Sequence, residues 1–517
     1  MAGLSSRDGL SGPLKAGAVL AAILCAGYVL GIRVGASTDR TSRVFLVLAS
    51  AGVFVLPIVL KSWRATFLCG LVYIASSGLL NHLTNYHTVT RTLKFAVLGA
   101  IVCHWFLSEG LDRVRSEGWR RYPLLVPLGA FAALSALEMF NPAWTTTMSG
   151  VKAGLSGLTM HVLPMVLVFV GYDFVTDKRQ LSTVLIFVVA VSSLIAAFGL
   201  FQYWIGLDKV AGWGESFSAT LRREHTWGKS SVPVMKPISM ASDAGEASMY
   251  YVLGFVLAAI LYFRPGGGAA RNLWFPAIMI LLLVALFLTQ LRFGMVAIAG
   301  TILFFFLFGN RGKCLFIVVL VAVAFFLAFF LSAPAGREVL VERYSVLQDP
   351  VDAAATNRGV QFEMIQIMCN HHPFGAGIGR AGPGAYVGAS EEDRATAEAP
   401  GENYYASLVY ETGIPGLLLM LGVFFLILRR AWVLYYRVPT DPENRTYCLG
   451  AAAFLLALMG SGMAGPVLYS TPASILFWFV AGVLFRLPAR DPQEEPLPVA
   501  GRYGEKSDAR QASVQLT

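Results

Sequence analysis

The stretch from Glu402 to Gly416 places polar side chains at the start of a long apolar run, and these side chains could bind or react with a substrate. Glu402 and Asn403 end a hydrophilic segment, and an apolar helix is predicted to begin directly after them. Polar groups at the border between an aqueous cavity and lipid are costly unless they have a task. The pattern therefore predicts a functional site, although a carboxylate can also lie at a helix start because the helix dipole favours it.

Three arginines accompany this site along the chain. Arg292 is a charged break between two apolar runs, Arg358 opens a predicted short helix at 357–369, and Arg380 ends a glycine-rich turn. A helix N-terminus adds a partial positive charge of about 0.5, so the surroundings of Arg358 predict an anion site. Plainer interpretations stay open, because Arg292 can mark the end of a hairpin at the membrane interface and Arg358 can pair with a nearby carboxylate.

The glycine-rich turn lies between His371 and Arg380. Such a turn either lets backbone N–H groups approach an anion or simply reverses the chain. Its spacing is similar to a dinucleotide-binding fingerprint, but no strand precedes it, which argues against that kind of site. His371 and the adjacent His372 cannot chelate one metal ion from a helix face, so no metal site is predicted. The glycines are Gly375, Gly377 and Gly379.

Composition indicates an integral membrane protein. Of the 517 residues, 56% are hydrophobic and only 14% are charged, and the mean hydropathy is +0.62, far outside the range of a soluble enzyme. The net charge of +9 comes from basic residues scattered over short loops. This distribution indicates topology signals and contacts with anionic lipid, and no nucleic-acid partner. The six cysteines include no C-x-x-C pair, so neither a disulfide framework nor a zinc site is indicated.

Hydropathy predicts an all-α polytopic membrane protein with about 12–14 transmembrane helices and a large extracytoplasmic loop that contains short helices. Fourteen apolar stretches have the roughly 15–26 residues needed to cross about 30 Å of hydrocarbon, and four short ones leave the count open. No small-x-small cleavage site follows the first stretch promptly, so we interpret it as a first span and not as a removable signal peptide. The stretches are 14–32, 44–60, 66–80, 93–107, 123–140, 151–174, 181–205, 248–263, 273–290, 294–308, 314–331, 404–428, 447–467 and 471–485.

Lys and Arg collect in alternate short loops, which predicts a cytoplasmic N-terminus. The two long hydrophilic segments, 206–247 and 332–403, then both lie outside, together with the candidate site. The short loop at 33–43 is an exception, because its arginines fall outside in this scheme. The tail at 488–517, rich in Pro, Glu and Gln, is predicted to be disordered and cytoplasmic.

The candidate residues follow one another in an informative order. The motifs are Leu288-Thr289 with Arg292 and Gly294, then Arg358, then Pro373-Phe374-Gly375-x-Gly377-x-Gly379, then Glu402-Asn403 with Gly413-Ile414-Pro415-Gly416. A basic segment that begins at Lys236 precedes an earlier span. This order resembles the superfamily of O-antigen ligases and O-antigen polymerases, and the resemblance covers roughly residues 236–433.

Hydropathy, composition and the resemblance together divide the chain into four predicted parts. An N-terminal set of transmembrane helices with the first long external loop occupies 1–235, and a catalytic region with the external loop 332–403 occupies 236–433. C-terminal transmembrane helices follow at 434–487, before the tail at 488–517.

The resemblance implies inverting glycosyl transfer on the outer face of the bacterial cytoplasmic (inner) membrane, from a saccharide linked to undecaprenyl diphosphate. It implies no cofactor, no metal ion and no nucleotide sugar. Glu402 is the expected base, and Arg292 and Arg358 are expected to bind the diphosphate through charge-assisted hydrogen bonds. The expected substrate-binding residues are Asn403, Arg380, Lys236, His372, Gly375 and Gly377.

One departure from the family pattern affects the predicted activity. The ligases of the family carry a histidine where this chain has Glu402. A carboxylate can serve as the base if its pKa stays near or below the working pH. The change argues against a standard lipid A-core ligase and favours a polymerase of repeat units.

The predicted function is therefore polymerisation of a cell-surface polysaccharide, either an O-antigen or an exopolysaccharide. The alternatives are an O-antigen ligase or O-oligosaccharyltransferase of the same superfamily, and a transporter or flippase of lipid-linked oligosaccharides. A transporter would show an internal repeat or paired broken helices, and neither is visible in the sequence. The expected partners are the lipid-linked oligosaccharide, the bilayer, a chain-length regulator and a flippase.

Overall fold

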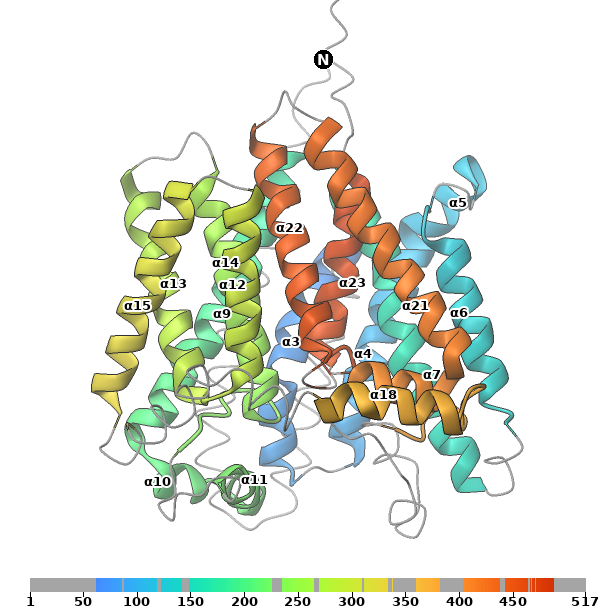
Figure 1. The fold of residues 1–517 in the computed structure, drawn as a ribbon, viewed down its shortest axis with the longest axis horizontal. Coiled ribbons are helices and arrows are strands. Elements are labelled where there is room, and N and C mark those ends of the chain that lie inside the picture. Colours follow the sequence, from blue (N-terminus) through green and yellow to red (C-terminus); the bar gives the residue numbers. More distant parts are fainter. Residues whose placement is uncertain are drawn as a thin grey trace, which may run out of the picture.

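The protein is described by a computed structural model whose described residues form a bundle of α-helices and no strand (Figure 1). These residues are 62–85, 88–118, 122–141, 148–225, 235–264, 269–308, 311–332, 337, 359–381, 403–437, 442–463, 465, 467–469 and 471–487. A π-helical turn, Phe106–Gly110, joins two of the helices. The α-helices are α3 (Trp63–Leu83), α4 (Thr88–Trp105), α5 (Leu111–Glu117), α6 (Leu125–Glu138), α7 (Met148–Met165), α8 (Leu167–Phe174), α9 (Lys178–Ile205), α10 (Leu207–Ala211), α11 (Glu215–His225), α12 (Ala244–Phe263), α13 (Ala269–Thr289), α14 (Arg292–Phe308), α15 (Arg311–Leu331), α18 (Gly359–His371), α21 (Tyr404–Arg437), α22 (Pro442–Ser461) and α23 (Thr471–Arg486).

The predicted apolar stretches coincide with these helices. In the described part of the chain, seven helices are long and apolar enough to cross a membrane, and four shorter helices are also apolar. Of the fourteen predicted stretches, only 14–32 and 44–60 lie outside the described residues, and each of the others coincides with a helix or a helix pair. The prediction of an all-α polytopic membrane protein is confirmed.

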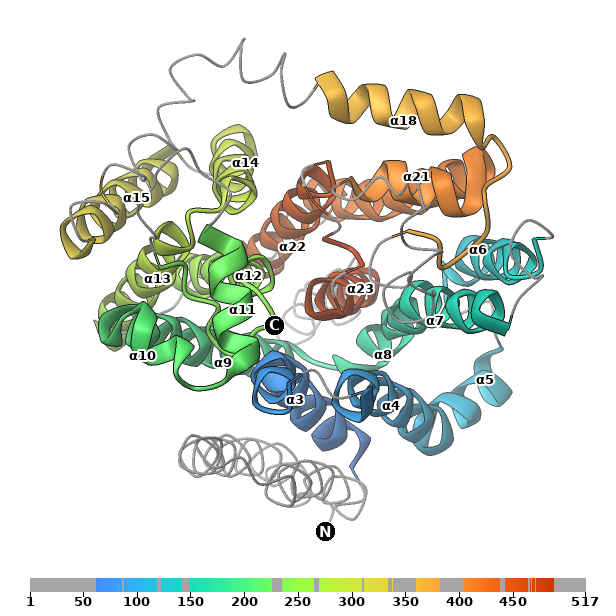
Figure 2. The same ribbon diagram turned by 90° about the horizontal axis from the view of Figure 1, so that it is seen from below.

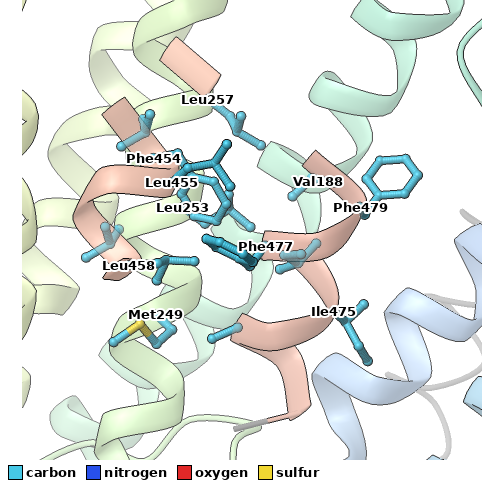
Figure 3. Close-up of a cluster of buried hydrophobic side chains, with 14 of the residues drawn as sticks. Val188, Met249, Leu253, Leu257, Phe454, Leu455, Leu458, Ile475, Phe477 and Phe479 are labelled. Carbon is cyan, nitrogen blue, oxygen red and sulfur yellow. The ribbon is translucent and has the colours of Figure 1, made fainter. Parts of the chain in front are cut away.

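The centre of the bundle is formed by α9, α12, α22 and α23, whose apolar side chains interdigitate (Figure 3). Lipid tails are as apolar as leucine, so helices in a membrane associate through close packing and small residues. The contact between α8 and α23 illustrates this rule. A Cβ at Gly171 would overlap the backbone of Phe479, and a Cβ at Gly482 would overlap the backbone of Val168.

Two of the long apolar segments are broken by proline or glycine. Pro164 lies in the last turn of α7, and a single turn residue, Val166, separates α7 from α8. Helix α21 contains a kink at Gly413, whose φ of 69° is left-handed, and Pro415 follows directly. Proline removes a backbone hydrogen bond and glycine tolerates positive φ, so both breaks have a local cause.

A polar network ties α4, α5 and α8 together. Asp173 is fully buried and accepts hydrogen bonds from Arg113 at 2.7 Å, Tyr122 at 2.8 Å and Trp105 at 3.1 Å. Arg113 also pairs at 2.8 Å with Glu109 of the π-helical turn. Because each of these donors binds an oxygen of the carboxylate, the network stabilises a charge that would otherwise be costly to bury.

The helices of both long hydrophilic segments lie at one end of the bundle. Figure 1 shows α10, α11 and α18 at its lower end, with α5 toward the other end. Seen from below in Figure 2, α18 lies along the edge of the bundle beside α21. The described helices of the two segments predicted to be external therefore share one side, whereas the orientation of that side in a cell stays a prediction.

Candidate active site

Asn403 begins helix α21. Its Oδ1 accepts hydrogen bonds from the backbone N–H groups of Tyr405 at 2.9 Å and Ala406 at 3.1 Å, which is the pattern of a helix N-cap. The side chain is 1% exposed. The predicted base, Glu402, directly precedes this cap and lies outside the described residues. Asn403 therefore fixes the helix start beside Glu402, and its predicted contact with substrate stays untested.

A second carboxylate, Glu411, lies two helical turns further along α21 and is fully buried. Its Oε2 accepts from Nε2 of His161 at 2.6 Å and from the hydroxyl of Tyr469 at 2.8 Å. Its Oε1 accepts from the backbone N–H groups of Gly379 at 2.9 Å and Ala381 at 3.0 Å. Four donors thus surround one carboxylate, which holds together α7, α21, the glycine-rich turn and the segment before α23.

Tyr469 acts as a donor to this carboxylate. Burial, together with the neighbouring charge of Glu411, raises the pKa of the Tyr469 phenol well above its usual value. The phenol therefore keeps its proton over the physiological pH range. Its ring also meets the ring of His161 edge to face, with centroids 4.6 Å apart.

The glycine-rich turn packs inside the protein, and the anion that it meets is Glu411. Gly375, Gly377 and Gly379 all have left-handed φ values, of 90°, 106° and 84°. Ile378 is fully buried. Of the two interpretations of the turn, the structure shows backbone N–H groups approaching an anion, but this anion belongs to the chain itself. The predicted contacts of Gly375 and Gly377 with substrate stay untested.

Arg380 lies between the two residues whose N–H groups bind Glu411, and it is half-buried. His372, at the start of the turn, places its ring edge to face with Tyr410 of α21, at a centroid distance of 5.0 Å. The predicted short helix is observed as α18. Its side chains Met368 and Cys369 pack against α21 beside the turn. Burial raises the pKa of the Cys369 thiol. Arg358, the residue before α18, lies outside the described residues.

Lys236 and Arg292 belong to a second group of candidates. Ile238 and Leu291, their close neighbours in sequence, pack into one apolar cluster with α10 and α11. Lys236 is 6% exposed. Helix α14 begins at Arg292, whose side chain lies outside the described part of the structure.

Strained backbone accompanies this second group. Gln290 is buried, has a left-handed φ of 56°, and its Oε1 has no hydrogen-bond partner among the described residues. Ser239 also has a φ of 56°, and its backbone is bound by the side chain of Gln202 at 2.7 and 3.1 Å. Positive φ at residues other than glycine is uncommon and concentrates at functional sites.

The structure thus brings the candidates together in two groups. Lys236 and Arg292 lie near α10 and α11, and Arg380, His372 and Asn403 lie near the start of α21. Among the described residues, no three His, Cys, Asp or Glu side chains gather closely enough to hold a metal ion. Glu411 and its partners were not predicted from the sequence. The one local indication was an acidic residue directly before Thr-Gly-Ile-Pro-Gly, inside a largely apolar helix.

Comparison with known proteins identifies the central part of the chain. Residues 277–421 match the family model described as O-antigen ligase, and this range contains Arg292, Arg358, the glycine-rich turn and the start of α21. A search of curated proteins gave no match. The protein is a multi-pass membrane protein whose residues 277–421 form a domain of the O-antigen ligase family, a family of membrane glycosyltransferase-type enzymes.

Proposed function

We propose that this protein polymerises a cell-surface polysaccharide by joining repeat units that are linked to undecaprenyl diphosphate. The observation that carries the proposal is the family match over 277–421, which contains most of the candidate residues. The position of the two candidate groups beside the helices α10, α11 and α18, at one end of the bundle, supports it further.

The proposed reaction is an inverting displacement at the anomeric carbon. The acceptor hydroxyl forms a bond to C1 of the donor sugar while the bond from C1 to the phosphate oxygen breaks. The acceptor proton passes to Glu402, and the leaving diphosphate keeps the bonding electron pair. Glu402 directly precedes the buried N-cap Asn403 in the sequence, and a general base must lie within hydrogen-bond reach of the proton that it accepts.

Arginines stabilise the leaving group in this proposal. Negative charge develops on the diphosphate as the C1–O bond breaks, and guanidinium groups bind phosphate oxygens through charge-assisted hydrogen bonds. Arg292 and Arg358 are assigned this role, with Arg380 and Lys236 as further ligands. Arg380 and Lys236 lie on segments that the bundle packs tightly, which suits a site partly shielded from water.

A ligase is the second candidate function, because the matching family model is described as O-antigen ligase. A ligase transfers the finished glycan from the same lipid carrier to another acceptor, so its donor chemistry is identical. Only the acceptor distinguishes the two activities. The glutamate at position 402, where the ligases carry histidine, is the feature that favours the polymerase.

The lipid-linked products of a deletion strain distinguish the candidates. Loss of a polymerase leaves single repeat units on undecaprenyl diphosphate, and this is the expected result. Full-length chains that stay on the carrier would show a ligase. Wild-type surface polysaccharide in the deletion strain would contradict both proposals. Complementation with the wild-type gene is the control.

A further inference from the structure

We infer that Glu411 is a positioning residue for Arg380, and this inference rests on the proposed function. Glu411 does not touch the substrate. It holds the backbone on both sides of Arg380, so that the guanidinium meets the diphosphate of the lipid-linked glycan in one fixed place.

The hydrogen bonds of the turn point to this role. Oε1 of Glu411 accepts from the N–H groups of Gly379 and Ala381, at 2.9 and 3.0 Å, and these residues flank Arg380. Two backbone bonds attach the rest of the turn to the same helix. Ala376 donates to the carbonyl of Tyr410 at 2.7 Å, and Ile414 donates to the carbonyl of Pro373 at 2.9 Å. The turn and the first part of α21 therefore form one unit.

Steric contacts fix the turn from its other side. A Cβ at Gly157 of α7 would overlap the backbone of Gly379, and a Cβ at Gly379 would overlap the backbone of Ala153. A Cβ at Gly413, in the kink of α21, would overlap the backbone of Pro373 and Phe374. The turn thus lies between α7 and α21, where glycines at three positions allow the backbones to approach closely.

The depth of the turn explains why a carboxylate is needed. Helix α21 rises about 1.5 Å per residue, so Glu411 lies about 10 Å from Tyr404 along the axis, well inside the bundle. Irregular backbone at this depth requires that its N–H groups find partners inside the protein. An ionised carboxylate is a strong acceptor for two N–H groups at once.

The partners of Glu411 make it unsuitable as the catalytic base. His161 and Tyr469 occupy Oε2, and the two backbone N–H groups occupy Oε1. A base needs an open oxygen within reach of the acceptor hydroxyl. Glu402 keeps the role of base, and Glu411 fixes Arg380 relative to the helix start where Glu402 lies.

A double-mutant cycle tests the inference in purified full-length protein, with polymer formation from a lipid-linked repeat unit as the assay. Arg380→Ala is expected to lower kcat/KM about 100-fold, as for loss of one charge-stabilising donor. Glu411→Ala is expected to lower it at least about 10-fold, and the double variant is expected to match Arg380→Ala within about threefold, because residues that act through one another are not additive. Losses that multiply, or an Arg380→Ala protein with full activity, would overturn the inference.

A second pair of variants avoids the risk that Glu411→Ala fails to fold. Gly157→Ala displaces the turn by steric overlap, although alanine is the better helix former. Gly129→Ala on α6 is the matched control, because a Cβ there meets open space. Gly157→Ala is expected to lower kcat/KM, and the double variant Gly157→Ala with Arg380→Ala is expected to lose little more than Arg380→Ala alone. Gly129→Ala is expected to leave activity unchanged, and equal effects of the two variants would contradict the inference.

Amide hydrogen exchange gives a readout without any substrate, so it separates this inference from the proposed function. Glu411→Ala and Gly157→Ala should speed exchange in the peptide that covers 375–381 at least about 10-fold, while Gly129→Ala should not. Unchanged exchange in both variants would show that Glu411 does not hold the turn. The wild-type protein could also form no glycosidic bond while the variants show the expected exchange. That result would contradict the proposed function and the role assigned to Arg380, but Glu411 would still be shown to hold the turn.

Discussion

At the scale of single residues, Glu402 carries the largest part of the proposed chemistry. It precedes Asn403, whose side chain is fixed by capping α21. A carboxylate at that position is either a general base or a favourable charge at a helix start. The two roles predict very different losses of reaction rate when Glu402 is replaced, so substitution distinguishes them.

Replacing Glu402 separates the two roles. Glu402→Gln keeps the size of the side chain but cannot accept a proton, so the rate is expected to fall about 10²–10⁴-fold. A helix-dipole carboxylate contributes only about 0.3–1 kcal/mol of stability and would leave the rate intact. Assays of purified variants with a lipid-linked repeat unit measure this difference. A folded Glu402→Gln protein within a few-fold of wild type would rule out the base.

Glu402→His tests the similarity to the histidine of the ligases. An imidazole has an ordinary pKa of about 6.5, well above that of a carboxyl group. A base works only when deprotonated, so the variant should regain part of the activity, with the acid limb of its pH–rate profile shifted to higher pH. An inactive histidine variant with normal expression would contradict this equivalence.

The arginines are expected to act on the leaving diphosphate. Arg292→Ala and Arg358→Ala should each lower turnover at least about 100-fold. Lysine at either position should rescue only part of the loss, because an ammonium group cannot form two parallel hydrogen bonds. Arg179→Ala is a suitable control, since Arg179 is exposed at the start of α9. Full polymer length and rate in Arg358→Ala would reassign Arg358 to an ion pair within its loop.

At the scale of helices, the polar network around Asp173 should determine stability and not chemistry. Arg113→Ala leaves the buried Asp173 without its cation, and breaking such a pair costs about 3–5 kcal/mol. Arg115→Ala on the same helix is the control, because Arg115 is exposed. Thermal unfolding in detergent should show a clearly lower unfolding temperature for Arg113→Ala than for Arg115→Ala. Equal unfolding temperatures for the two would show that Asp173 does not depend on Arg113.

Hydropathy could predict the helices, because a span must hide about 20 apolar residues in lipid whatever surrounds it. The start of α21 and the helix α18 were likewise readable from local sequence. The anchor at Glu411 could not be predicted, because its partner His161 lies 250 residues away in the sequence. For the same reason, the sequence does not predict that the glycine-rich turn packs between α7 and α21, because these contacts join residues far apart in the chain.

At the scale of the whole molecule, the membrane orientation remains a prediction from loop charges. Reporter fusions at Ser216 and Glu391 should be external. Fusions on the opposite side should be cytoplasmic, at Glu117, Lys178, Gly267 and Arg437. A cytoplasmic reporter at Glu391 would contradict the assignment of the site to the outer face, because the lipid-linked donor would then be on the wrong side.

We propose above all that this protein forms glycosidic bonds between lipid-linked repeat units. The most direct measurement reconstitutes the purified full-length chain in lipid vesicles with a single undecaprenyl-diphosphate-linked repeat unit, without other proteins, and follows both products. We expect a ladder of longer lipid-linked chains and one free undecaprenyl diphosphate for each new bond, with neither product formed by Glu402→Gln. A folded wild-type protein that leaves the repeat unit unchanged, or moves it across the bilayer without joining units, would contradict the proposed polymerisation.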